Sequence, residues 1–143
     1  MFESINPATE QVLARYATMP AEALTVALEE ARSTARVWSR VEVGLRAAML
    51  ERVADLLDAK REEFAQLITA EVGKPIAEAR AELDKCALLC RYYAEHAVEF
   101  LADQRIQSGT HESVLSYEPL GAVLGIMPWN FRFGRCFALP SPS

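Results

Sequence analysis

Cysteine and histidine are among the residue types in this 143-residue sequence that could do nucleophilic, metal or acid–base chemistry. Cys86 and Cys90 are four residues apart, which would place them on one face of a helix, and His96 follows. No fourth metal ligand lies nearby and the spacing fits no known zinc motif, so we interpret both cysteines as small buried or half-buried residues. We interpret His96 and His111 as surface or hairpin residues rather than catalysts.

The amino-acid composition indicates the class of protein that carries these residues. The chain is 51% hydrophobic and 24% charged, which is typical of a globular domain and argues against disorder. A net charge of −5 disfavours a nucleic-acid partner and an anionic membrane surface. No apolar run reaches the ~18 residues of a membrane span, and residues 1–7 lack the features of a secretory signal. We therefore expect a cytoplasmic protein without nucleic-acid or membrane partners, and no disulfide framework.

Apolar residues recur at helical spacing through most of the first hundred positions. A first helix is predicted after Thr18, which could act as its N-cap. A second helical stretch covers about residues 43–72, either as one helix or as two that meet near Asp58. Gly73 should end that stretch. A third helix is predicted over about residues 76–102.

Strand signals lie at both ends of the chain. Residues 1–17 predict a strand–turn–strand unit around an Asn-Pro pair. Residues 103–118 predict a β-hairpin that turns near Gly109. Residues 122–127 form a continuous apolar run, which is typical of a strand buried on both faces of a parallel sheet. Such a strand needs partners from later sequence, so we expect an incomplete α/β unit of poor stability, with an exposed apolar strand at its end.

Four short motifs in these elements resemble those of a known protein family. In order and spacing they resemble the aldehyde dehydrogenase superfamily over about residues 4–131. Within it, residues 85–96 look most like the succinate-semialdehyde dehydrogenase branch. The motifs are Asn6–Thr9 (NPAT), Glu71–Pro75 (EVGKP), Tyr117–Gly121 (YEPLG) and Met127–Phe131 (MPWNF).

The resemblance implies an α/β fold with an NAD(P)-binding domain, a catalytic domain and a small β arm used for homo-oligomerisation. Residues 1–143 would then be a partial N-terminal, cofactor-binding domain. They would comprise a helical lead-in, the β-hairpin of the oligomerisation arm at about 103–118, and the first strand of a Rossmann-like sheet.

The resemblance also implies site residues. Asn130 matches the family asparagine whose side-chain amide donates to the substrate oxygen, where negative charge develops when a cysteine thiolate attacks the aldehyde. One such contact is typically worth ~3 kcal/mol. Ile126, Pro128 and Trp129, together with Asn130, match positions that line NAD or NADP, as expected at the C-terminal end of a parallel strand. The small-molecule aldehyde, in one hypothesis succinate semialdehyde, would be oxidised to the carboxylic acid.

The family's catalytic cysteine and glutamate would lie beyond residue 143, and no glycine-rich phosphate loop occurs in the chain. We therefore expect an inactive fragment. An alternative is a non-catalytic module that associates with full-length family members. A third reading is a short enzyme that uses Cys136, which is strongly disfavoured because Cys136 lies in the tail that departs from the family and the family nucleophile comes much later.

Residues 132–143 depart from the family pattern. The family usually continues after Phe131 with proline, an aromatic residue and Trp-Gln-Val-Phe, but this chain continues from Arg132 to Pro140 without them. Loss of one C at the Phe-Pro junction would shift the frame into the observed residues. We therefore hypothesise a frameshift and an early stop, either in the gene or in its sequencing, which would make 132–143 a divergent tail.

Overall fold

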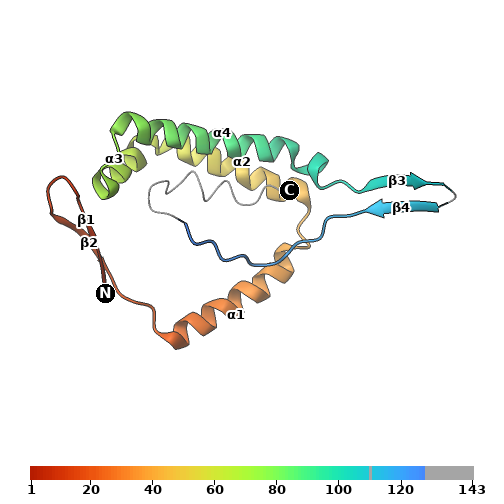
Figure 1. The fold of residues 1–143 in the computed structure, drawn as a ribbon, viewed down its shortest axis with the longest axis horizontal. Helices are drawn as coiled ribbons and strands as arrows, with labels where there is room; N and C mark the ends of the chain where they lie inside the picture. Colours follow the sequence, from red (N-terminus) through yellow and green to blue (C-terminus); the bar gives the residue numbers. More distant parts are fainter. Residues whose placement is uncertain (110, 128–143) are drawn as a thin grey trace.

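The computed structural model describes residues 1–109 and 111–127, which form helices and two antiparallel hairpins (Figure 1). The predicted α/β class is confirmed. Among these residues no helix is long and apolar enough to cross a membrane. In chain order the elements are β1 (Phe2–Ile5), β2 (Val12–Tyr16), α1 (Ala21–Trp38), α2 (Val43–Ala59), α3 (Arg61–Val72), α4 (Ile76–Phe100), β3 (Gln104–Ser108) and β4 (His111–Leu115).

Helices α2, α3 and α4 pack together as a helical layer around the buried core of the described residues (Figure 1). Each helix contributes large side chains to this core: Leu57 from α2, Ile68 from α3 and Leu83 from α4, all at most 4% exposed. Small residues surround them, which lets the helix backbones approach closely. The other core residues are Ala54, Ala65, Ala79, Cys86, Ala87 and Cys90.

The helical stretch over residues 43–72 is two helices, which confirms the second of the two readings. The junction is Lys60, where φ is −104° and ψ is 15°, two residues after Asp58. The second helix ends at Gly73, which adopts the left-handed conformation with φ of 71°. The predicted third helix is also confirmed as α4.

The start of α1 differs from the prediction. Its N-cap is Pro20, whose carbonyl accepts from Leu24 N–H at 3.0 Å, and no side chain caps the helix. Thr18 instead accepts a hydrogen bond on Oγ1 from the Met1 ammonium group at 3.1 Å. The fixed φ of proline suits the first turn of a helix, so Pro20 rather than Thr18 sets the boundary.

Both predicted hairpins are present. Strands β1 and β2 pair antiparallel with a shift of register between Ser4 and Ile5. Strands β3 and β4 pair in register from Gln104 with Leu115 to Ser108 with His111, and this hairpin projects from the end of the helical layer (Figure 1).

The sequence predicted an exposed strand at residues 122–127; the exposure is confirmed, but the strand itself is not formed. These residues have no β-structure, and Val123, Leu124 and Ile126 are 66%, 86% and 89% exposed. A parallel strand exists only when a neighbour supplies its hydrogen bonds, and no described segment does so here. The apolar run therefore lies open at the surface, as expected for a strand without partners.

Candidate functional site

Of the residues predicted to line the cofactor, Ile126 is described, and it lies at the surface with 89% of its area exposed. Pro128, Trp129 and Asn130 lie outside the described residues, as does Cys136. No described residue encloses Ile126, and the described glycines form no phosphate-binding loop. The described residues therefore do not by themselves fit a dinucleotide.

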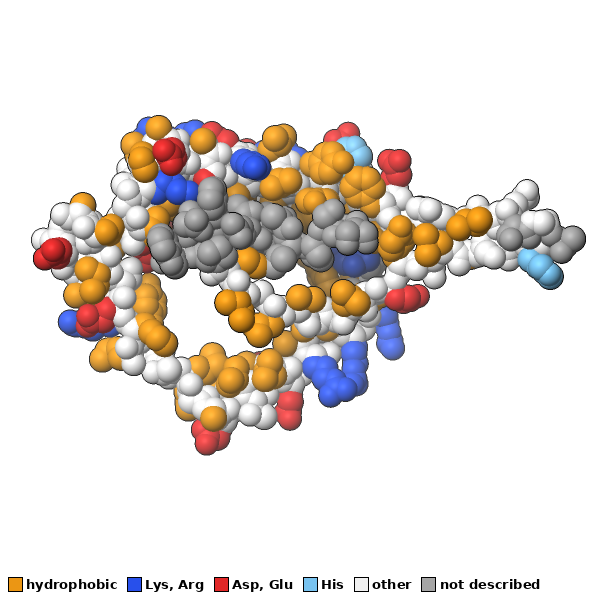
Figure 2. Space-filling model, viewed as in Figure 1, with side chains coloured by type: hydrophobic (Ala, Val, Ile, Leu, Met, Phe, Trp, Pro, Cys, Tyr) orange, Lys and Arg blue, Asp and Glu red, His pale blue; other side chains and the backbone are white. Residues whose placement is uncertain are grey.

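A groove lies between α1 and the segment that leads to Ile126. Leu28, Ala31 and Ala35 supply an apolar wall, and residues 119–122 run opposite them. Figure 2 shows hydrophobic side chains along the side of α1 that faces this segment. Arg32 also lines the groove, so it combines apolar surface with positive charge.

The groove between α1 and residues 119–122 holds no activated nucleophile among its described lining residues. Ser39 lines it, but the Ser39 hydroxyl donates to the carbonyl of Arg36 at 3.0 Å. No histidine or carboxylate lines the groove to take a proton from Ser39. This arrangement can hold an apolar or anionic group but offers no residues for bond cleavage.

The first two family-like motifs meet in space. Asn6 Oδ1 accepts from the backbone N–H groups of Ala8 and Thr9 at 2.9 and 3.3 Å, which fixes the turn between β1 and β2. A Cβ placed on Gly73 would lie 3.0 Å from Cγ of Pro7, so this turn packs against the end of α3. Beside it, Ser4 Oγ donates to Glu71 Oε1 at 2.9 Å.

Lys74, from the same motif, forms an ion pair with Glu82 on α4. Their side chains are only 13% and 4% exposed, so this pair lies inside the helical layer. Helical periodicity alone did not predict this pair, because it does not show which charged residues are buried. The signal available in the sequence was a carboxylate in the second turn of the predicted third helix, eight residues after Lys74.

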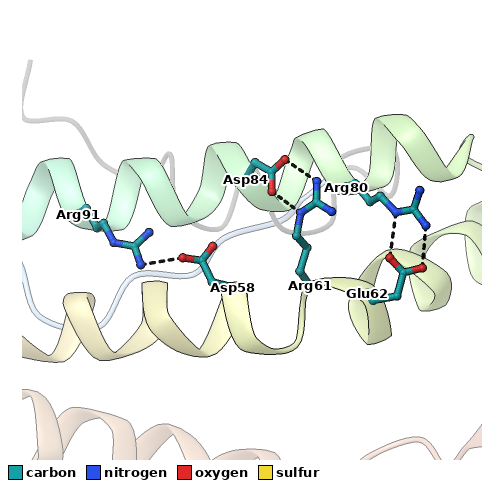
Figure 3. Close-up of polar contacts among 6 residues, drawn as sticks. All are labelled: Asp58, Arg61, Glu62, Arg80, Asp84 and Arg91. Carbon is teal, nitrogen blue, oxygen red and sulfur yellow. Dashed lines mark hydrogen bonds and ion pairs between the residues drawn. The ribbon is translucent and has the colours of Figure 1, made fainter.

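Three arginines join α4 to its neighbours through exposed ion pairs (Figure 3). Arg61 binds Asp84, Arg80 binds both oxygens of Glu62 at 2.8 and 2.9 Å, and Arg91 binds Asp58. Arg91 also binds Asp55, at 3.0 Å. Hydrogen bonds from Arg61 lower the pKa of Asp84, and hydrogen bonds from Arg80 lower the pKa of Glu62. These charges are paired and solvated, which indicates a structural role.

The cysteines occupy the positions that the sequence predicted. Cys86 and Cys90 are 0% and 2% exposed in the core, and burial raises the pKa of the Cys90 thiol. A raised pKa disfavours the thiolate that nucleophilic chemistry needs. No group of metal-ligating side chains occurs among the described residues.

The two histidines lie near the C-terminal end of α4 and on β4. The ring of His96 stacks between Tyr92 and Phe100, with centroid distances of 4.4 and 5.6 Å, and its Nδ1 lies 2.8 Å from the Tyr92 carbonyl oxygen. His111 is the exposed first residue of β4. Neither lies beside a nucleophile, in agreement with the prediction that they are surface and hairpin residues.

Comparisons with known proteins agree with the motifs. The sequence model described as "Aldehyde dehydrogenase family" matches residues 1–137. A probable NADP+ succinate-semialdehyde dehydrogenase from Synechocystis is 38% identical over 98% of this chain and 31% of its own length. An NAD(P)+ succinate semialdehyde dehydrogenase from Escherichia coli is 42% identical over 90% of this chain and 28% of its own length.

The structural comparison gives the same result. Succinic semialdehyde dehydrogenase from Streptococcus pyogenes, solved with NADP+, is 30% identical and superposes with a TM-score of 0.91. The match covers 96% of this chain and 30% of that protein. The chain thus spans about a third of the length of these relatives.

Proposed function

The chain belongs to the aldehyde dehydrogenase family, and we propose that it supplies the N-terminal part of an NAD(P)-dependent enzyme that oxidises an aldehyde to a carboxylic acid. The match of residues 1–137 to the family carries this proposal. The identity of the aldehyde is a narrower proposal. Succinate semialdehyde is favoured because relatives named for that substrate match nearly the whole chain at 38% and 42% identity.

Asn130 is the residue of this chain that we assign to the chemistry. Its side-chain amide would donate to the aldehyde oxygen and stabilise the negative charge that develops there. Ile126, Pro128 and Trp129 would contact the cofactor, which supplies the oxidant when bound. The described residues do not enclose a cofactor, so these roles require structure that the rest of an aldehyde dehydrogenase would provide.

A chimera tests these assignments. Residues 1–131 of this chain would replace the matching part of the Escherichia coli relative, and oxidation of succinate semialdehyde would be followed by the absorbance of the reduced nicotinamide. We expect the chimera to be active. Asn130→Ala in it should lower kcat by about a hundredfold or more, the usual effect of removing one oxyanion donor.

The matched control in the chimera is Asn6→Ala, which removes an amide of the same size from the β1–β2 turn. It should leave kcat within about twofold of the unmodified chimera. Equal kcat for the Asn130→Ala and unmodified chimeras would refute the role of Asn130. A folded chimera without any activity would refute the proposed function.

We propose further that the 143-residue chain is inactive alone. The support is that the described residues combine no nucleophile with a base, and Ile126 is exposed. Purified chain incubated with succinate semialdehyde and either NAD+ or NADP+ should give no reduced cofactor, while the Escherichia coli enzyme does so in parallel. Turnover by the chain itself would contradict this proposal.

An alternative function is association with full-length family members. The exposed apolar surface favours it, since Leu24, Leu28 and Leu124 are 51%, 62% and 86% exposed. Tagged chain co-expressed with the Escherichia coli relative should then co-purify with it, and Leu28→Glu should weaken this. The matched control is Glu30→Gln on the same helix. Absence of co-purification at equal expression would count against this alternative.

For the tail we keep the proposal of a frameshift near Phe131. Sequencing the DNA across and downstream of this codon tests it. If another reading frame of this DNA encodes the family sequence after Phe131, the proposal is supported. If no frame encodes it, the proposal is refuted.

A further inference from the structure

A second groove lies where the C-terminal ends of α1 and α4 meet the N-terminal end of α2, close to the base of the β3–β4 hairpin (Figure 1). Apolar side chains line it from all three helices, among them Trp38, Leu50, Ala97 and Leu101. Its volume is about 330 Å³, at the lower end of the range for small-molecule sites. It shares no residue with the predicted cofactor positions.

Arg46 is the charged residue among the described lining of this groove. Its Nε is buried and has no hydrogen-bond partner, and Arg46 forms no ion pair with any described residue. Lys74, a buried donor of the same helical layer, pairs with Glu82, whereas the buried Thr69 hydroxyl, like Arg46 Nε, has no hydrogen-bond partner among the described residues. A buried guanidinium N–H without an acceptor is costly, and no described residue supplies an acceptor to Arg46.

We propose that this groove binds a small monocarboxylate with an apolar body, and that Arg46 binds its carboxylate. Guanidinium and carboxylate match in charge and in planar geometry, which makes the carboxylate the preferred partner of an unpaired arginine. The apolar lining from Trp38 to Leu101 would cover the rest of the molecule. A dicarboxylate fits less well, because its second charge would face this apolar wall without a partner.

Octanoate is a suitable probe. 1-Octanol is the control with an alkyl chain of the same length and no charge, and acetate is the control with the carboxylate and no long alkyl chain. Titration of the purified 143-residue chain by calorimetry should give saturable binding with one octanoate per chain. Octanol and acetate should each bind at least about tenfold more weakly. The indole N–H signal of Trp38 in NMR spectra can be assigned because it is missing from the Trp38→Phe variant. This signal should shift when octanoate is added.

Arg46→Met retains the length of the side chain and removes the charge, and we expect it to weaken octanoate binding by about tenfold or more. Arg52→Met is the matched control, since Arg52 lies exposed on the same helix and the change in net charge is identical. It should bind as the unmodified chain does. If Arg46→Met does not fold, Ala97→Phe, which fills the groove from α4, should abolish binding instead.

Two results would overturn the proposal. One is equal affinity for octanoate and octanol, which would show that the apolar surface binds any alkyl chain whatever its charge. The other is unchanged octanoate binding in Arg46→Met or in Ala97→Phe, which would place the ligand elsewhere. Activity of an aldehyde dehydrogenase enters neither measurement, so failure here leaves the proposed function untouched.

Discussion

The carboxylate of Glu82 lies within the helical layer beside the ammonium group of Lys74. Burying a charge is costly unless an opposite charge accompanies it, so each of these residues depends on the other. The pair joins the residue after Gly73 to the second turn of α4. It therefore holds the tight connection between α3 and α4, on which the packing of the core depends.

Removing one member of this pair should be far more damaging than removing a surface pair. Lys74→Met leaves the Glu82 carboxylate buried without this cation and should lower the free energy of unfolding by about 3 kcal/mol. Arg105→Met breaks the exposed Arg105–Glu112 pair and should cost less than about 1 kcal/mol. Urea denaturation of both variants measures the difference. Equal losses would show that Glu82 is not effectively desolvated.

The surface pairs instead predict a pH dependence. The pKa values of Asp84 and Glu62 are lower in the folded chain, because Arg61 and Arg80 donate hydrogen bonds to their charged forms. Their stabilisation is therefore complete above the ordinary carboxyl pKa near 4 and is lost as the pH falls through the lower folded value. Stability measured by urea denaturation should fall below about pH 4.

The double variant Arg61→Met with Arg80→Met should lose less stability over that acid range than the unmodified chain. A double variant with Arg32→Met and Arg36→Met on α1 removes the same charge and serves as the control. It should keep the full acid dependence. An unchanged acid dependence in the first double variant would assign the effect to other carboxylates.

At the scale of elements, the turn after α3 depends on one glycine. Gly73 has φ of 71°, and a Cβ there would approach Pro7 Cγ to 3.0 Å. Gly73→Ala should therefore cost about 1 kcal/mol or more from the left-handed backbone, together with displacement of the β1–β2 turn. Gly109→Ala is the control, since φ there is 60° but nothing lies within 4 Å of its Cβ.

Thermal unfolding distinguishes the two glycine variants. Both should lower the melting temperature through backbone strain, and Gly73→Ala should lower it further through the clash with Pro7. Hydrogen exchange in β1 and β2 should increase only in Gly73→Ala. Equal effects on both observables would show that the contact between Pro7 and Gly73 contributes nothing.

The elements that the sequence predicted well are those with strong local signals. The 3.6-residue period of α4, the left-handed glycine after α3 and the turn residues of both hairpins act within a few positions of the chain. The strand at residues 122–127 failed because its formation depends on partners far away in sequence. The Lys74–Glu82 pair and the unpaired Arg46 were missed for the same reason, since burial is a property of the packed helices.

At the scale of the whole molecule, the described chain is unevenly stable. Helices α2, α3 and α4 share a core, whereas α1 has no buried residue and its Leu24 and Leu28 are more than half exposed. A helix of 18 residues without buried contacts is only marginally stable in water. Yet the same arrangement superposes on the complete Streptococcus pyogenes enzyme with a TM-score of 0.91.

Hydrogen exchange should reveal this unevenness. Amides in α1 should exchange much faster than those in the buried turns of α4, because opening α1 exposes little apolar surface. In the active chimera described above, α1 should become protected, since further protein would cover its apolar side. Strong protection of α1 in the 143-residue chain alone would show that it is already packed.

The bond between Ser4 and Glu71 spans 67 positions of the chain. During synthesis the amino-terminal hairpin emerges from the ribosome first, yet the surface on which it rests is made only after α3 has been translated. Until then its strands have no docking partner and are open to chaperones and proteases. A ribosome that pauses within α2 would lengthen this exposed interval, so the rate of translation there bears directly on the yield of folded chain.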